Sequence, residues 1–277
     1  MSPFVNAEAQ EKNAGVQQNE EASRLLNLGV DYAEKKNWDK AIEHLNKALA
    51  LDPRNSAAYI DLSLAYTEKK EFPNAVNFAQ KAVDLAVNKS SAYHTLGLAY
   101  EGAGNTEKAR AAYKQGLMAD PKNSDLYLTL GNLYGKEKNL DEAIKAYGQA
   151  IEANPRNVFA YSNIAYVYQE KKEAQKAIEY LTKAADVDPK DPIAWFDLGA
   201  AYDKEGNLPK AVECYEKSFS LNEKFYKTVL SLAMAYEKQG QLEKSASFYT
   251  KALSLTDDVR LKEAILKKIT QTSEKKI

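Results

Sequence analysis

The sequence predicts an all-α fold built as a tandem array of helix pairs. A 34-residue period recurs seven times without a gap between residues 22 and 259 of the 277-residue chain. Tyrosine occupies the eleventh position of every unit, and alanine occupies the twentieth position of six units, with Ser245 in the last. In an array of this kind, each unit buries its apolar face only by stacking on its neighbours. Function is therefore expected on the shared surface of the stack rather than in one enclosed active site.

The period also sets the boundaries of the parts. The seven units are residues 22–55, 56–89, 90–123, 124–157, 158–191, 192–225 and 226–259. Residues 1–21 are rich in Gln, Asn and Glu and poor in large apolar side chains, so we expect a mobile polar tail there. Residues 260–277 are expected to form a capping helix and tail that shield the last repeat. The apolar face of this capping helix is expected to contain Leu261, Ile265, Leu266 and Ile269.

Two helices are predicted within each unit from their end signals. The residues placed to cap the first helix of the next unit are Asn55, Asn123, Asn157 and Asp191. The first helix is expected to end where Gly or Asn can adopt the left-handed conformation, as at Lys36-Asn37, Gly104-Asn105 and Lys138-Asn139. An acid or a proline then opens the second helix, because both are favoured in a first turn.

The spacing of the repeated residues resembles the tetratricopeptide repeat, a helix-turn-helix unit of the same length. The segment that carries this resemblance most clearly contains Trp195, Leu198, Gly199, Tyr202, Ala211 and Tyr215. The resemblance covers 238 of the 277 residues. It implies a right-handed superhelical solenoid of seven helix-turn-helix repeats with a C-terminal capping helix.

Two repeat positions depart from the family pattern. The glycine expected at position eight is replaced by the small residues Ser63, Ala165 and Ala233, which still allow a close helix approach. The proline expected at position 32 is replaced by Val87, Glu223 and Asp257, so we expect looser turns after those three repeats.

No motif in the chain indicates an enzyme or a bound cofactor. Two histidines and one cysteine are too few for a His/Cys metal site, and they fall in three different repeats. Cys214 occupies a mostly apolar repeat position, which favours a packed hydrophobic side chain over a nucleophile. Gly102 and Gly104 begin like a dinucleotide-binding motif, but Glu107 stands at its third glycine and no strand is predicted before it.

Composition limits the setting and the partners. The formal net charge is −1, which gives no general attraction to nucleic acid or to anionic lipid. No apolar run approaches the roughly 20 residues that span a bilayer. The first residues lack the basic and apolar regions of a secretory signal, and the single cysteine suits a reducing compartment. We therefore expect a cytoplasmic protein with no membrane insertion and no nucleic-acid partner.

One face of each first helix carries the functional prediction. Repeat positions 2, 5, 6, 9, 12 and 13 follow helical spacing and point away from the packed stripe at positions 4, 7, 8 and 11. We call the side chains at these six positions the groove face. The family resemblance implies that they line the concave inner surface of the superhelix, where extended peptides commonly bind. Position six is a short polar residue in every unit, and large apolar residues recur at positions two, five and nine.

The residues predicted to bind a partner all belong to the groove face. They are Asn27, Asp61, His94, Thr95, Leu128, Thr129, Asn132, Phe159, Asn163, Tyr166, Phe196, Asp197, Leu230 and Met234. Short polar groups suit hydrogen bonding to a peptide backbone, and the apolar groups between them suit its side chains. Some leucines and valines at positions five and nine would equally serve to pack one unit against the next. Exposed aromatic groups are harder to explain without a partner.

The charge of the groove face narrows the kind of partner. It contains nine acids and four bases, and no base precedes Lys136. An extended peptide that is apolar and partly basic is therefore expected, with repeats four to six as the energetic centre. The carboxylate clamp of chaperone-binding family members needs lysine, asparagine and arginine at fixed positions of consecutive units, and no three units here supply that pattern.

Three functions from different classes remain open at this point. The favoured one is a non-enzymatic protein-interaction scaffold. The alternatives are a structural module that assembles with copies of itself, and a specificity subunit of an enzyme encoded elsewhere, as in glycosyltransferases that carry such arrays with a row of asparagines. Only Asn27 and Asn163 supply asparagine at position six here, so that last likeness is partial.

Overall fold

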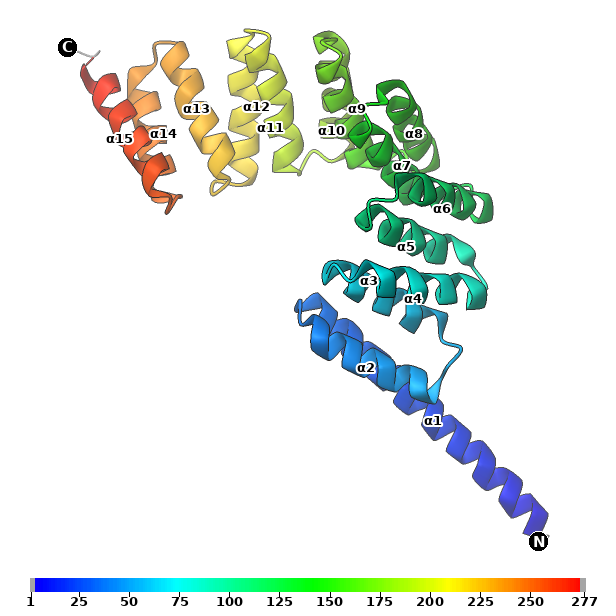
Figure 1. The fold of residues 1–277 in the computed structure, drawn as a ribbon. Helices are drawn as coiled ribbons and strands as arrows, with labels where there is room; N and C mark the ends of the chain where they lie inside the picture. The colour runs from blue at the N-terminus through cyan, green and yellow to red at the C-terminus, as the bar shows by residue number, and fades with distance from the viewer. Residues whose placement is uncertain (1–2, 275–277) are drawn as a thin grey trace. The chain divides into compact units, whose positions relative to one another are not determined.

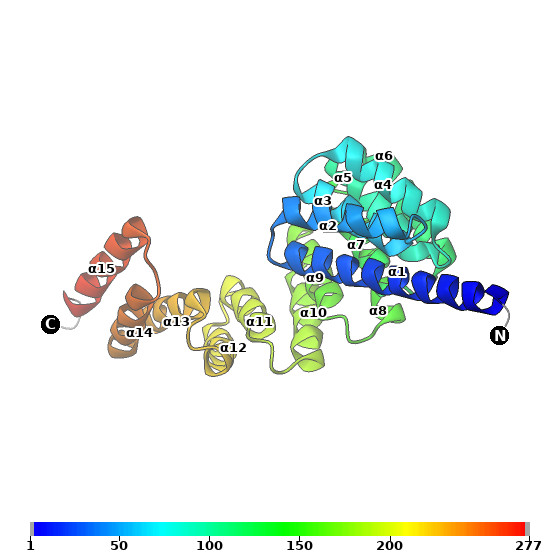
Figure 2. The same cartoon turned by 90° about the horizontal axis from the view of Figure 1, so that it is seen from below.

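The computed structural model describes the backbone of residues 3–274 and the side chains of residues 16–272. The described chain is entirely helical apart from its turns, and fifteen α-helices follow one another in tandem (Figures 1 and 2). The helices are α1 Pro3–Glu34, α2 Trp38–Leu51, α3 Ser56–Glu68, α4 Phe72–Leu85, α5 Lys89–Gly102, α6 Thr106–Ala119, α7 Ser124–Lys136, α8 Leu140–Ala153, α9 Val158–Glu170, α10 Ala174–Val187, α11 Pro192–Lys204, α12 Leu208–Leu221, α13 Tyr226–Lys238, α14 Leu242–Ser254 and α15 Val259–Glu274. The predicted all-α array of helix pairs is confirmed.

The chain divides into two compact parts, each larger than one repeat, which we call unit 1 (Met1–Leu133) and unit 2 (Tyr134–Ile277). In the first unit, α1 packs on α2, α3 on α4, and α5 on α6, and successive pairs stack through α2 on α3 and α4 on α5. In the second unit, α9 packs on α10, α11 on α12, and α13 on α14, with α15 against α14. Each unit therefore buries its apolar faces by stacking, as expected of repeats.

The predicted caps of the first helices form in the structure. The side chain of Asn55 accepts a hydrogen bond from the Ala58 amide at 3.1 Å, and Asn123 accepts one from the Leu126 amide at 3.0 Å. Asn157 and Asp191 cap α9 and α11 in the same way. Each bond satisfies one of the amides that a helix start leaves unpaired, so these residues fix where the first helices begin.

The turns inside the repeats differ from one expectation. Glycine takes the left-handed conformation where it is present, as at Gly104 with φ of 75°. Where glycine is absent, lysine rather than asparagine adopts it, as at Lys36 with φ of 56°. Asn37 is not free to do so, because its side chain caps α2 by accepting from the Lys40 amide. The capping role therefore decides the conformation of the asparagine.

Close packing inside each pair explains the small residues at position eight. A Cβ atom added to Gly97 would lie 2.1 Å from the ring of Tyr113, a tyrosine that is completely buried. Ser63 replaces this glycine in the second repeat, and its buried hydroxyl donates to the carbonyl of Ala75 at 2.8 Å. The replacement is tolerated because its polar group is satisfied.

The capping helix uses a narrower face than the sequence predicts. Ile265 is buried and Ile269 is partly buried against the cluster that contains Val229 and Tyr249. Leu261 and Leu266, which were expected on the same face, are 40% and 50% exposed. Leu261 and Leu266 therefore lie outside the packed face of α15, which Ile265 and Ile269 form.

The first helix starts earlier than the predicted repeat boundary. Helix α1 runs without a break from Pro3 into the first repeat, so residues 3–21 continue the repeat helix. The side chains of residues 1–15 lie outside the described part of the chain. The mobility of the segment 1–21 stays a prediction.

Candidate functional site

In unit 1, the groove face is acidic and is built on α1, α3, α5 and α7. Asn27 is exposed, and so are the carboxylates of Glu34, Glu68 and Asp125. Asp61 lies half-buried on α3, and burial raises the pKa of its carboxyl group to about 6. These side chains give the face a negative potential that attracts cationic groups of a partner.

Several polar side chains predicted on this face are occupied by the protein itself. Thr95 is buried, and its hydroxyl donates to the carbonyl of Ser91 at 3.1 Å on the same helix. Thr129 donates to the carbonyl of Asp125 at 2.8 Å and meets the His94 ring, with 3.2 Å between Oγ1 and Nε2. Burial lowers the pKa of His94, which favours the neutral form of its ring. Because Thr95 is buried, its side chain is not accessible to a partner.

The remaining predicted residues of unit 1 differ in their access to solvent. Leu128 is half-buried, which suits packing between repeats as well as binding to a partner. Asn132 is exposed on α7 and takes part in an interaction within the chain. The row of polar groups in unit 1 is therefore interrupted, and its acids are the more continuous feature.

In unit 2, large apolar side chains are exposed on the groove face of three consecutive repeats. Phe159 is 73% exposed, Ile193 54%, Tyr166 47% and Met234 44%. All four occupy position two or nine of a first helix. In the repeat helices of this unit, the described chain exposes no other large apolar side chain to this degree. Ile193 was missed by the sequence prediction, although its place at position two, equivalent to that of Phe159, could have identified it.

Two polar residues beside these apolar groups are already engaged. The Tyr166 hydroxyl donates to Asp197 Oδ2 at 3.0 Å and links position nine of one repeat to position six of the next. Burial raises the pKa of Asp197, while the hydrogen bond from Tyr166 opposes that change. Asn163 hydrogen-bonds the hydroxyl of Tyr147. These contacts hold the polar groups in place and leave part of their hydrogen-bonding capacity for a partner.

Phe196 and Leu230 serve mainly to pack the repeats. The Phe196 ring lies 5.8 Å from the ring of Tyr215 and 5.4 Å from that of Phe225, measured between centroids. Leu230 is half-buried against the cluster of Val229 and Tyr249. The structure therefore places both side chains in the seams between helices, whereas the sequence predicted an exposed anchor for Phe196 and left packing open for Leu230.

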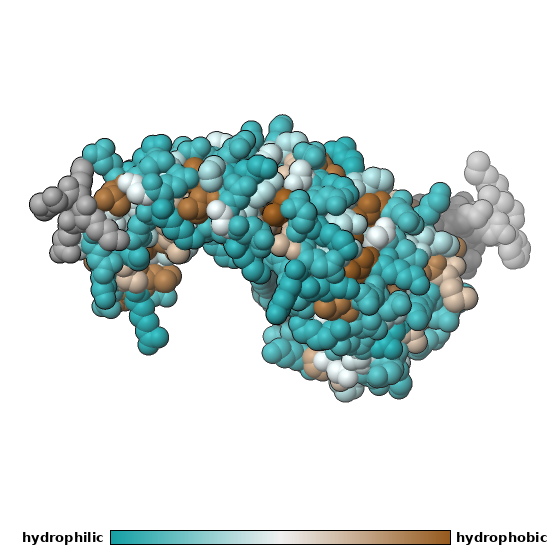
Figure 3. All heavy atoms as spheres, turned by 90° about the horizontal axis from the view of Figure 1, so that it is seen from above, coloured by the Kyte–Doolittle hydropathy of each residue, from teal (hydrophilic) through white to brown (hydrophobic). Residues whose placement is uncertain are grey.

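Two lysines of unit 2 pair with acids that lie two helices earlier in the chain. Lys238 bonds Asp203 at 2.6 Å, and Lys268 of α15 bonds Glu237 at 3.1 Å. Met234 borders a shallow pocket with Glu237, Lys238 and Lys268. Met234 is thus surrounded by charged groups of both signs, and Figure 3 shows a largely hydrophilic surface with scattered hydrophobic groups.

Metal ligands and a reactive cysteine are two chemical features that an enzyme could use. The described residues hold no group of three or more His, Cys, Asp or Glu side chains that could bind a metal ion. Cys214 is buried, and burial raises the pKa of its thiol to about 11, so it is a poor nucleophile. No helix in this part of the chain combines the length and the apolar character needed to cross a membrane.

The match to family models decides the family. The model of the tetratricopeptide repeat matches residues 22–55, and the model described as the C-terminal domain of cilia and flagella-associated protein 70 matches residues 79–276. This chain belongs to the tetratricopeptide repeat family. Proteins of this family generally mediate protein–protein interactions, and their repeat scaffold is generally non-catalytic. No match is found among curated proteins.

Solved structures of other tetratricopeptide repeat proteins share the fold. A crystal structure of MamA is 29% identical, with a TM-score of 0.52, and the match covers 58% of this chain and 94% of MamA. Pseudomonas aeruginosa pilF is 18% identical, with a TM-score of 0.61, covering 78% of this chain and 98% of pilF. Yeast Tom70 is 19% identical, with a TM-score of 0.68, covering 99% of this chain and 58% of Tom70. The last two likenesses concern the fold alone.

Proposed function

We propose that this tetratricopeptide repeat protein is a non-enzymatic scaffold that binds an extended segment of another protein on its groove face. The observation that carries the proposal is the exposure of Phe159, Tyr166, Ile193 and Met234 at equivalent positions of three consecutive repeats. Large apolar groups gathered on one exposed face of a soluble domain commonly mark an interaction site. Aromatic side chains also dominate the energetics of protein interfaces.

The proposed partner segment is apolar and partly basic. Its apolar side chains would lie against the four exposed groups of unit 2. Basic side chains of the partner would be attracted by the acids of unit 1, among them Asp61 and Glu68. Charge of this kind acts mainly on the rate of association and on specificity. A cytoplasmic setting is part of the proposal and is supported by the single cysteine.

Affinity purification with matched variants tests this proposal. Phe159→Ala and Tyr166→Ala each remove an exposed ring from the groove face. The control is Met118→Ala, which removes an exposed apolar side chain from α6, away from the groove face. A protein that is captured by the wild type and by Met118→Ala, but lost by both groove variants, is the expected partner. A partner peptide should then bind the groove variants about 5–30-fold more weakly. Equal binding by all four proteins would exclude the groove face.

Self-association is a second candidate, supported by the last helix. Val259, Leu261 and Leu266 of α15 are 67%, 40% and 50% exposed. Apolar groups on an end helix can join two copies of an array. Sedimentation at increasing protein concentration tests this candidate, and Leu266→Glu should abolish any rise in mass. A mass that stays that of one chain at high concentration would remove it.

A further inference from the structure

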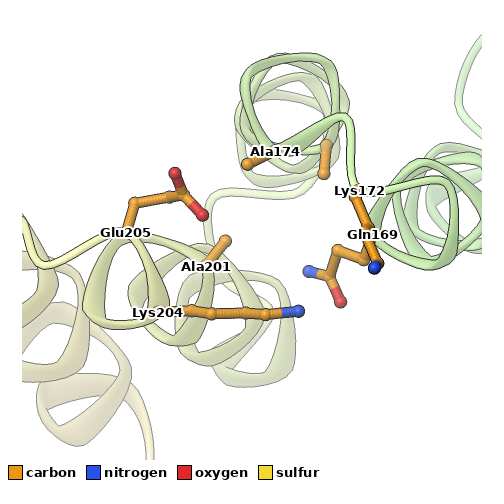
Figure 4. A pocket seen from close by; sticks show the side chains of 7 residues that line it. Gln169, Lys172, Ala174, Ala201, Lys204 and Glu205 are labelled. Carbon is orange, nitrogen blue, oxygen red and sulfur yellow. The ribbon is translucent and has the colours of Figure 1, made fainter.

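Unit 2 contains a small pocket between the turn that joins α9 to α10 and the last turn of α11 (Figure 4). Its volume is about 120 Å³. Its lining residues are Gln169, Lys172, Ala174, Ala177, Ala201, Lys204 and Glu205. The three alanines form apolar walls, and the longer polar side chains surround them.

The pocket lies where the fifth repeat has the smallest side chain of the seven repeats. Position 17 opens the second helix of each repeat, and it is Trp38, Phe72, Thr106, Leu140, Leu208 or Leu242 in the other six repeats. The fifth repeat has Ala174 there. In unit 1, Phe72 fills the equivalent place, since a Cβ atom added to Gly102 of the next repeat would lie 2.5 Å from its Cε1. Lys204 is the counterpart of Gly102 beside Ala174.

The size of the pocket favours an aliphatic side chain over an aromatic one. A well-formed apolar cavity of about 150 Å³ holds one benzene molecule. The pocket beside Ala174 is smaller, at about 120 Å³, and it is open on one side. A leucine, isoleucine, valine or methionine side chain therefore suits it better than a phenylalanine ring.

The rim of the pocket selects for charge. Lys172 and Lys204 extend toward Gln169 in Figure 4. Neither lysine forms a salt bridge within the described chain, whereas neighbouring Lys171 binds Asp141 at 2.6 Å. Glu205 is the single acid among the lining residues. The lysine side of the rim therefore offers two cationic groups to a carboxylate that enters beside the apolar walls.

We propose that this pocket binds an aliphatic side chain of the partner segment, with an adjacent carboxylate held between Lys172 and Lys204. The inference rests on the proposed function in that the occupant belongs to the same partner. It adds an acidic-aliphatic element to a segment that is otherwise apolar and basic. It also places an anchor site on the fifth and sixth repeats, beside Gln169 and Lys204 of the groove face.

Titration with small probes followed by NMR tests the pocket directly. The protein is labelled at its alanine methyl groups, and the signals of Ala177 and Ala201 are followed during addition of N-acetyl-leucine. We expect saturable shifts with a dissociation constant on the order of millimolar, as suits a ligand of this size. N-acetyl-leucinamide, which lacks the carboxylate, should bind several-fold more weakly. Absence of shifts at both methyl groups would overturn the proposal.

Two kinds of variant separate the apolar and the ionic parts. Ala174→Leu supplies the missing side chain and should abolish the shifts caused by N-acetyl-leucine. Thr106→Leu makes an equivalent change at position 17 in unit 1 and should bind the probe as the wild type does. The double variant Lys172→Gln, Lys204→Gln should bind the acid and the amide equally. Unchanged binding by Ala174→Leu, or an unchanged preference for the acid in the double variant, would refute the assignment.

The result is distinguishable from failure of the proposed function. Tyr166→Ala should leave the binding of N-acetyl-leucine unchanged, because Tyr166 does not line the pocket. If Ala174→Leu weakens a partner peptide about tenfold while Tyr166→Ala has no effect, the pocket stands and the role proposed for the exposed apolar side chains of the groove face fails. The opposite pattern would keep the groove face and reject the pocket. Shifts that arise on raising the protein concentration without any probe would assign the pocket to a second copy of the chain and overturn the proposal.

Discussion

Replacing two aromatic residues of the groove face separates packing from binding. Phe196 and Phe159 lie on the first helices of adjacent repeats, but Phe196 is half-buried between Tyr215 and Phe225, and Phe159 is 73% exposed. Full burial makes a Phe→Ala change cost about 3–5 kcal/mol of unfolding free energy. About half of that, with the lost ring contacts, gives about 2–3 kcal/mol for Phe196→Ala. Phe159→Ala should change stability by no more than about 0.5 kcal/mol.

Urea unfolding followed by circular dichroism measures the two effects. Trp195 precedes Phe196 in α11, so its fluorescence reports the same region, and a Trp38→Phe background removes the other tryptophan. We expect a lower midpoint for Phe196→Ala and an unchanged one for Phe159→Ala. The affinity for a partner peptide should show the reverse order, with Phe159→Ala weakening binding more than Phe196→Ala does. Equal losses of stability in the two variants would refute the division of the groove face into packed and exposed rings.

Three further predictions concern the fold and its response to pH. In thermal unfolding, Gly97→Ala should destabilise the protein by about 1–3 kcal/mol, because the added Cβ would meet the buried ring of Tyr113. Gly148→Ala should stabilise it by about 0.5–1 kcal/mol, because the added Cβ meets nothing within 4 Å. The folded-state pKa of Asp61 is raised from 3.8 to about 6, so its neutral form favours the fold, and the stability it contributes is complete below pH 4 and lost as pH rises through 6. This decrease in the free energy of unfolding is about 1–2 kcal/mol, a value reduced for the partial exposure of the carboxyl group. Asp61→Asn should remove the decrease, and a pH profile of stability identical to that of the wild type would contradict the assignment. Deleting α15 should expose the cluster under Ile265 and fray the last repeat, and hydrogen exchange in α13 and α14 that matches the full chain would argue against a capping role.

The sequence could predict the helix pairs and their ends because those features follow from a fixed period. Asn55 and Asn123 each stand directly before the first helix of a repeat, and the structure confirms both as caps. Burial on the groove face was harder to predict, because it depends on the neighbour across a seam as well as on the angle around the helix. Phe196 is covered because Phe225, at the end of the same repeat, lies against it, and the period alone does not give that contact. Thr95 is likewise buried by its position beside the packed stripe.

The fifth repeat combines two departures that have opposite effects on its surface. Inside the seam, Ala174 stands where five of the other six repeats have a large side chain and the third has Thr106, and this opens the pocket beside Lys204. On the groove face, Phe159 and Tyr166 place large rings in solvent, where other repeats have smaller or more buried groups. A repeat optimised only for stacking would show the reverse arrangement, with bulk in the seam and polar groups outside, because buried apolar area stabilises the array and exposed apolar area does not. The exchange of bulk from the inside to the outside is therefore an argument for the proposal that this repeat contacts the partner segment.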